Sequence, residues 1–135
     1  MALSELEQIS LVQLAMQKVN VVPYEDNGIS FGTNVKCVEI SENEVSVCEC
    51  YIDVAETKRT CHVGFSAVLD HSATSTFIVE VDGSKRPKEY LNTNATMQFM
   101  DFFLLDRGLH HIEVKAKAES LVNIAPREAK LGVYL

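Results

Sequence analysis

The chain has no tryptophan, only three prolines, six glycines and few basic side chains. Twelve Lys and Arg against 19 Asp and Glu give a formal net charge of −7. Because this charge repels polyanions, nucleic acid and anionic membranes are not expected partners. No apolar run approaches the roughly 20 residues of a membrane span. Residues 1–5 show no basic region followed by an apolar block, so we expect synthesis in the cytoplasm without a signal peptide.

The 135 residues are enough for one domain with its own core, and 47% of them are hydrophobic. The four cysteines are Cys37, Cys48, Cys50 and Cys61. A chain of this size does not need disulfides to fold, so we interpret them as reduced, buried thiols of an intracellular protein.

Residues 1–22 carry the pattern of an amphipathic helix. Ser4 and Glu7 have the spacing of a capping box. The apolar stripe that follows recurs at helical intervals and consists of Leu6, Ile9, Val12 and Met16. This stripe would either pack on its own domain or meet copies of itself in an oligomer. A turn over 24–28 then separates the helical segment from a β domain over 29–135.

From residue 29 onward the pattern is that of antiparallel β structure. Short alternating runs end at turn signals such as Asp82-Gly83, which favours an antiparallel, jelly-roll-like β-sandwich. The alternation changes phase near Val47-Cys48, which predicts a bulge there. The eight predicted strands are 34–40, 44–53, 58–70, 76–81, 96–105, 109–118, 121–124 and 129–135.

The run over 96–105 is apolar on both faces, unlike the others. One face carries Met97, Phe99, Phe103 and Leu105, and the opposite face carries Met100, Phe102 and Leu104. A strand of this kind must be covered on both sides. We predict that the core covers the first face, and that the helical segment or another copy of the chain covers the second. The predicted oligomer interface is therefore Leu6, Ile9, Val12, Met16, Met100, Phe102 and Leu104.

Catalytic and metal-binding signals are weak. Cys48 and Cys50, with Cys61 and His62, resemble a zinc set only in residue type, because the spacing does not suit a knuckle and Cys61 and His62 point to opposite faces. Asp70-His71-Ser72 holds triad residue types side by side, which is the form of a turn. We expect no catalytic residue, no metal and no cofactor.

The segment 82–94 is predicted to be an exposed loop, and its residues Lys85, Arg86, Lys88 and Tyr90 form the candidate ligand site. The basic residues suit local anion binding, although the surrounding Gly, Ser and Pro favour a solvated turn. Tyr90 is the tyrosine best placed to stack on a sugar ring.

Three segments resemble the jelly-roll modules of bacteriophage structural proteins. They are the run from Phe77 to Gly83, the run Leu105-Asp106-Arg107-Gly108-Leu109-His110-His111-Ile112-Glu113-Val114-Lys115-Ala116 and the ending Ala129–Leu135. Those modules are similar to tumour-necrosis-factor-like sandwiches. The resemblance implies a homotrimer, often anchored to a virion through an N-terminal helical segment. It implies no functional residues, because such modules share a scaffold and not a site.

These observations predict a non-enzymatic structural or attachment module of a phage or prophage particle, assembling as a homo-oligomer with a trimer favoured. Its expected partners are copies of itself, other virion proteins or a surface glycan. A carbohydrate- or ligand-binding module is the first alternative, and a small cupin-like metal enzyme is the second.

Overall fold

The computed structural model describes residues 28–135, which form eight antiparallel strands and no helix. The predicted helical segment 1–22, with Leu6, Ile9, Val12 and Met16, lies outside the described residues. No helix within the described range is long and apolar enough to cross a membrane. The strands are β1 (Ile29–Thr33), β2 (Val38–Ile40), β3 (Val45–Val68), β4 (Ser75–Val81), β5 (Ser84–Asn92), β6 (Thr96–Ala118), β7 (Val122–Ile124) and β8 (Ala129–Tyr134).

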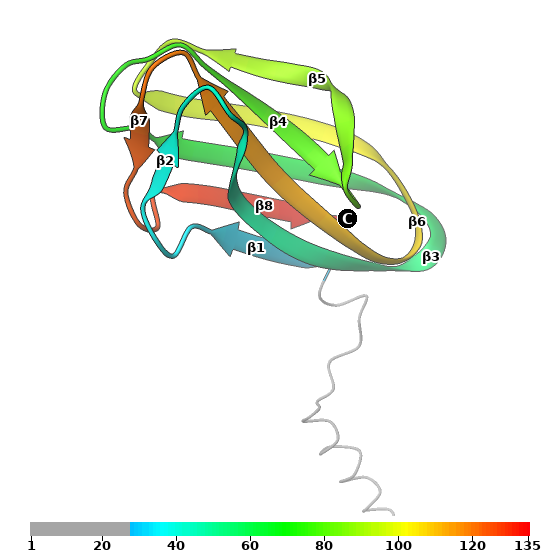
Figure 1. Ribbon diagram of the computed structural model, residues 1–135. Coiled ribbons are helices and arrows are strands. Elements are labelled where there is room, and N and C mark those ends of the chain that lie inside the picture. Colours follow the sequence, from blue (N-terminus) through cyan, green and yellow to red (C-terminus); the bar gives the residue numbers. More distant parts are fainter. Residues whose placement is uncertain (1–27) are drawn as a thin grey trace, which may run out of the picture.

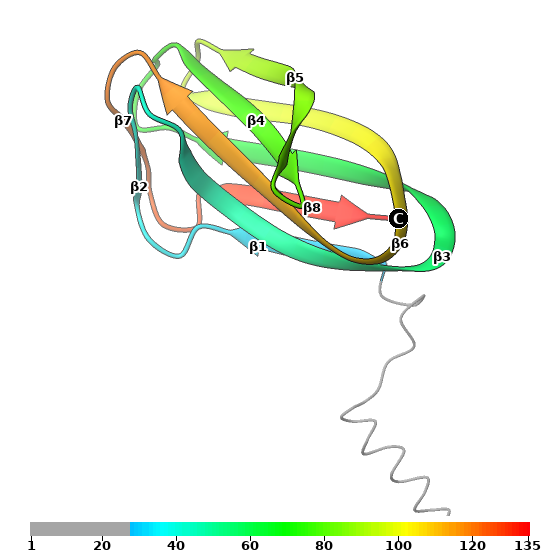
Figure 2. The same ribbon diagram turned by 45° about the vertical axis from the view of Figure 1, so that its right-hand side comes forward.

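Two long strands, β3 and β6, pair with each other over almost their whole length and curve around one end of the molecule (Figures 1 and 2). Their pairing shifts register between Val54 and Lys58, at the bend. Each strand therefore contributes its two halves to two different layers. The polar stretch 53–58, predicted to be a connection, is part of β3, and Gly108 lets β6 bend with a φ of 128°.

The strand order is β1-β8-β3-β6-β4-β5. The first layer consists of β1, β8, the later half of β3 and the early half of β6. The second layer consists of the early half of β3, the later half of β6, β4 and β5. A separate pair, β2 and β7, lies at the end opposite the bend (Figure 1).

The core lies between these layers. Phe65 of the first layer and Phe77 of the second have ring centroids 5.5 Å apart, and both side chains are buried. Alternate residues of β3, β6 and β8 also point inward, as their sequence alternation predicts. A single apolar cluster therefore joins both layers, and the prediction of a mainly antiparallel β-sandwich is confirmed.

Side chains and backbone contacts close the two open sides of the sandwich. On one side, Tyr90 of β5 stacks on Phe99 of β6 with centroids 4.0 Å apart. On the other side, β1 runs so close to β3 that a Cβ at Gly32 would lie 2.1 Å from the carbonyl oxygen of Glu49. Only glycine fits at this position without moving the backbone.

The number of strands agrees with the prediction, but the division of the chain does not. Segments 44–53 and 58–70 merge into β3, and 96–105 and 109–118 merge into β6. Two strands, β1 and β5, were not predicted, and the segment 34–40 is wrong as one strand. Asn34 ends β1 instead: its buried amide donates to the carbonyls of Lys36, at 2.9 Å, and Ala125, at 2.9 Å, and its Oδ1 accepts from the N–H of Ala129 at 3.0 Å.

The predicted local irregularities are confirmed. The β3–β6 register shifts between Ser46 and Cys48, where the bulge was expected. Asp82 and Gly83 have φ values of 53° and 86°, as a two-residue type I′ hairpin turn requires. This turn leads directly into β5, so the predicted loop 82–94 is wrong, and most of it is a strand.

Candidate functional site

The outer face of the first layer gathers apolar side chains from four strands. The pairing registers place Phe102, His62, Tyr134 and Ile29 in one row across β6, β3, β8 and β1. The next row holds Met100, Gly64, Gly132 and Phe31 in the same strand order. We call this surface the apolar face, and it consists of Ile29, Phe31, His62, Gly64, Met100, Phe102, Leu104, Gly132 and Tyr134.

The large side chains of the apolar face are exposed to solvent within residues 28–135. Met100, Phe102 and Leu104 are 65%, 67% and 62% exposed, and Phe31 is 77% exposed. The opposite face of the same β6 segment is buried in the core, as predicted. Single exposed apolar residues are ordinary, but a contiguous set across four strands marks an interaction surface.

Two glycines make a hollow in the apolar face. Gly64 and Gly132 pair with each other across β3 and β8, between Met100 on one side and Phe31 on the other. The hollow has a volume of about 410 Å³, and a Cβ at Gly64 would meet open space. Ser66, Gln98 and Lys130 also line the hollow, so it is apolar beside the glycines and polar at one end, with room for a side chain of a partner.

Sequence reasoning found Met100, Phe102 and Leu104 but missed the β1 and β8 members of the apolar face. Phe31 and Ile29 fall in a segment with no predicted strand, and Tyr134 falls in a strand with only one apolar side assigned. The alternation of Tyr134 with the buried Leu131 and Val133 was the available signal. It shows that Tyr134 points outward, but not that it aligns with Phe102.

The outer face of the second layer is different in chemistry, and we call it the charged face: Glu44, Glu80, Lys85, Glu113, Lys115 and Lys117. Lys85 Nζ lies 2.6 Å from Glu44 Oε2, and Lys115 Nζ lies 3.3 Å from Glu80 Oε2. Hydrogen bonding to Glu44 raises the pKa of Lys85. These ion pairs satisfy the charges within one molecule, and they cover Ile78, which points outward from β4 and is nevertheless buried.

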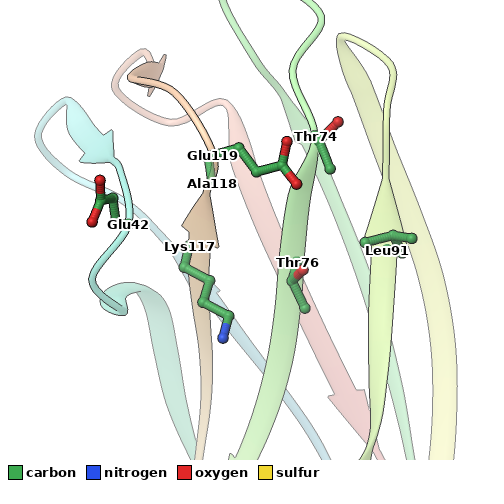
Figure 3. Close-up of a pocket in the computed structure, with 7 residues that line it drawn as sticks. All are labelled: Glu42, Thr74, Thr76, Leu91, Lys117, Ala118 and Glu119. Atoms are coloured by element: carbon green, nitrogen blue, oxygen red, sulfur yellow. The ribbon is translucent and has the colours of Figure 1, made fainter.

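A second hollow, of about 420 Å³, lies at the end of the charged face (Figure 3). Its rim is fixed by backbone bonds from Glu119 N to Thr74 O, at 3.0 Å, and from Ala118 N to Ser41 O, at 2.6 Å. The lining residues combine donors, acceptors and one exposed leucine: Glu42, Thr74, Thr76, Leu91, Lys117, Ala118 and Glu119. The ion pairs found in residues 28–135 do not include Glu42, Lys117 or Glu119.

The four residues of the candidate ligand site lie on β5 and already have partners. Lys85 pairs with Glu44. The Nε atom of Arg86 lies 3.5 Å from Asp101 Oδ2, and the guanidinium carbon of Arg86 lies 4.5 Å from the centre of the Phe103 ring. One face of the Tyr90 ring stacks on Phe99, and Lys88 Nζ lies 5.1 Å from its centre. Their role in binding a ligand stays a prediction, and these contacts hold them in place on the domain.

Three of the four cysteines lie in buried positions that are unsuited to nucleophilic chemistry. Burial raises the pKa of Cys48 and of Cys61 to about 12 and also raises that of Cys50, so these thiols hold their protons at neutral pH. Cys37 is exposed, which differs from the expectation that the cysteines are buried. The interpretation of the other three as buried thiols is confirmed.

The other sequence candidates for chemistry are structural contacts. Cys61 points into the core and His62 out of it, and within residues 28–135 no three His, Cys, Asp or Glu side chains come together to hold a metal. Asp70 accepts from the backbone N–H of Asn123 at 3.0 Å and from its Nδ2 at 3.1 Å, and pairs with His71 at 2.8 Å. This cluster fastens the turn after β3 to β7.

The sequence matches no known protein-family model and no curated protein. The structure is similar to murine APRIL, with a TM-score of 0.53 and 16% identity over 79% of this chain and 98% of that one. It also resembles a family 35 carbohydrate binding module from Clostridium thermocellum (TM-score 0.45, 13% identity, 83% of this chain and 95% of that one). Eiger TNF from S. frugiperda gives a TM-score of 0.48 and 8% identity over 78% of this chain and 90% of that one. At these identities a likeness concerns the fold alone, and the similarity to murine APRIL agrees with the predicted jelly-roll β-sandwich.

Proposed function

We propose that this domain is a non-enzymatic assembly module that associates with copies of itself through the apolar face, with a homotrimer as the favoured state. The observation that carries the proposal is the two-row apolar surface across β1, β8, β3 and β6. Leaving this surface in water is unfavourable, at roughly 25 cal/mol per Å² of apolar area. Burying it between copies removes that cost and supplies the driving force for assembly.

The chemistry of the face suits another copy of the chain better than a small polar ligand. Phe102, Met100 and Leu104 stand out from the surface, and the glycine hollow beside them accepts apolar groups of that kind. The next row along the strands is polar, and its Gln98, Ser66 and Lys130 line one end of the hollow. A surface that has both protruding side chains and a hollow can pair with the same surface of another copy.

The biological setting proposed with this module is a phage or prophage particle, in which it would serve as a structural or attachment part and contact other virion proteins or a surface glycan. This setting rests on the resemblance in strand and turn pattern, and the assembly proposal does not depend on it. Tail or capsid genes beside the coding sequence would support the setting, and a neighbourhood of unrelated metabolic genes would remove it.

The test of assembly is the molar mass in solution. Sedimentation equilibrium of the full chain at micromolar concentration should give an oligomer. Phe102→Asp should weaken association at least 100-fold, because the new carboxylate would be buried without a partner. The matched control is Lys117→Asp, which places the same carboxylate on the charged face and should leave the mass unchanged. A monomeric wild-type chain, or equal effects of the two variants, would contradict the proposal.

The second candidate function is carbohydrate binding at the hollow on the charged face. The hollow offers both hydrogen-bond donors and acceptors: two threonine hydroxyls, the Lys117 ammonium and the carboxylates of Glu42 and Glu119 (Figure 3). Leu91 offers an apolar patch for the face of a sugar ring. Sugars require this mixture of groups. Glycan-array binding that is lost in Lys117→Ala and kept in Phe102→Asp would support this function, and no binding by the wild-type chain would remove it.

A further inference from the structure

His62 differs from the other three histidines of the chain in its surroundings. His71, His110 and His111 each contact a carboxylate: Asp70 at 2.8 Å, Asp82 at 2.7 Å and Glu49, respectively. His62 forms no ion pair within residues 28–135. Its neighbours are aromatic instead, with Tyr134 stacked at a centroid distance of 4.9 Å and Phe102 at 6.3 Å.

The position of His62 is central in the apolar face. It stands in the first row between Phe102 and Tyr134, and Thr60 and Gly64 flank it along β3. The charged groups on this outer surface lie further along the strands. They are the Lys58–Asp106 ion pair toward the bend and Lys130 toward the other end. Among residues 28–135, no carboxylate is therefore paired with His62 to compensate a positive charge.

We infer that the protonation of His62 controls self-association through the apolar face: the neutral ring permits assembly and the imidazolium opposes it. This inference rests on the proposed function. Burial of the face between copies would remove water from the ring, and an unpaired charge is costly in such surroundings. The module would therefore assemble at neutral pH and dissociate in a mildly acidic compartment.

The size of the effect follows from the titration of a histidine side chain. The charge of a histidine side chain ordinarily changes between pH 5 and 8, so a fall from pH 8.0 to pH 5.5 favours the imidazolium. Only the neutral ring can be buried without an unpaired charge, so each protomer that joins the assembly should lose roughly tenfold in affinity. The other three histidines contact carboxylates of the same molecule and are not part of the apolar face, so their protonation should not change association through it.

The experiment measures association of the full chain at pH 8.0 and pH 5.5 at constant ionic strength by sedimentation equilibrium, with circular dichroism to verify folding. The wild-type affinity should fall at least tenfold between the two pH values. His62→Gln keeps a polar side chain without a titratable ring, and its affinity should change less than about twofold. His71→Gln, on an exposed turn away from the face, should retain the wild-type response.

The outcomes separate this inference from the proposed function. A wild-type chain that assembles equally at both pH values, or a His62→Gln variant with the wild-type pH response, overturns the role of His62 and leaves self-association standing. A chain that is monomeric at both pH values overturns both.

Discussion

The two outer faces of the sandwich share one core but differ in how their side chains are satisfied. On the charged face, Lys85 and Lys115 have carboxylate partners within the same molecule. On the apolar face, Met100, Phe102 and Phe31 have no such cover in the described residues. Both faces belong to layers of similar construction, and β3 and β6 contribute to each.

The difference between the two faces indicates which surface to test first for function. Ion pairs at a surface suit contact with water and give little net stability. An apolar surface is unfavourable in water, and it is retained where something covers it. The apolar face is for this reason the first functional candidate, and the hollow at the end of the charged face is the second. The predictions below test this division of roles.

The largest effect is expected from the core that holds the faces together. Phe77→Ala removes a fully buried ring that contacts Phe65 across the layers, and it should lower the free energy of unfolding by about 3–5 kcal/mol. Thr76→Ala, the next residue outward on the same strand, should cost under about 1 kcal/mol. Urea unfolding, carried out on the Phe102→Asp background so that association does not contribute, gives both values. Similar losses for the two variants would show that the faces do not share this core.

An intermediate effect is expected from an ion pair on the charged face. Lys115→Met leaves the buried carboxylate of Glu80 without its partner and should cost about 1–3 kcal/mol, with most of the loss recovered when Glu80→Gln is added. Lys130→Met, beside the apolar face, removes a lysine that has no carboxylate partner in the described residues. It should change stability by under about 0.5 kcal/mol. Equal costs for the two lysines, read from denaturant midpoints, would contradict the difference between the faces.

The smallest effect is a pH dependence at the β4–β5 turn. Burial acts to lower the pKa of His110, but hydrogen bonds to Asp82 and to the Asp106 carbonyl outweigh it and raise the pKa above 6.5. Burial likewise acts to raise the pKa of Asp82, but hydrogen bonds from His110 and the His111 N–H lower it below 3.8. The stabilisation from His110 is present below pH 6.5 and is lost as the pH rises through its raised pKa. That from Asp82 is present above pH 3.8 and is lost as the pH falls through its lowered pKa.

The His110–Asp82 contact should therefore contribute most between about pH 4 and 6.5, by under about 1 kcal/mol. The measurement is the difference in unfolding free energy between the Phe102→Asp protein and the same protein with His110→Gln, at pH 5.5 and pH 8.5. The difference should be larger at pH 5.5. This sign is opposite to the one expected for association through His62, which sharpens the contrast between a paired and an unpaired histidine. A difference that grows with pH would be inconsistent with the geometry of the turn.

Much of the fold could be predicted because β-strands reveal their inward side by alternation. Local patterns were enough to predict three features: the inward-pointing side chains Ile112, Val114 and Ala116, the bulge near Val47 and the Asp82-Gly83 turn. The strand β5 could not be predicted, since Lys85-Arg86-Pro87-Lys88 is typical of a loop. It becomes a strand because β4 beside it offers an edge, and Pro87 is tolerated on the outermost strand of the sheet.

The candidate site was partly predictable for a similar reason. Met100, Phe102 and Leu104 stood out because they alternate with a second apolar set on the same strand. Phe31, Tyr134 and His62 did not, since each is a single outward residue on its own strand. Whether such residues form one surface depends on the registers between strands, which a single sequence does not state.

The sequence by itself determined the strand class of the chain, its tight turn and which side chains point inward, because these depend on a two-residue period and on local turn chemistry. Only the tertiary structure decided that β3 and β6 bend to serve both layers, and that residues 29, 134, 62 and 102 stand in one row. Those features depend on pairing between segments up to about a hundred residues apart in the chain, where hydrogen bonds across strands set the register and local patterns carry no information about it.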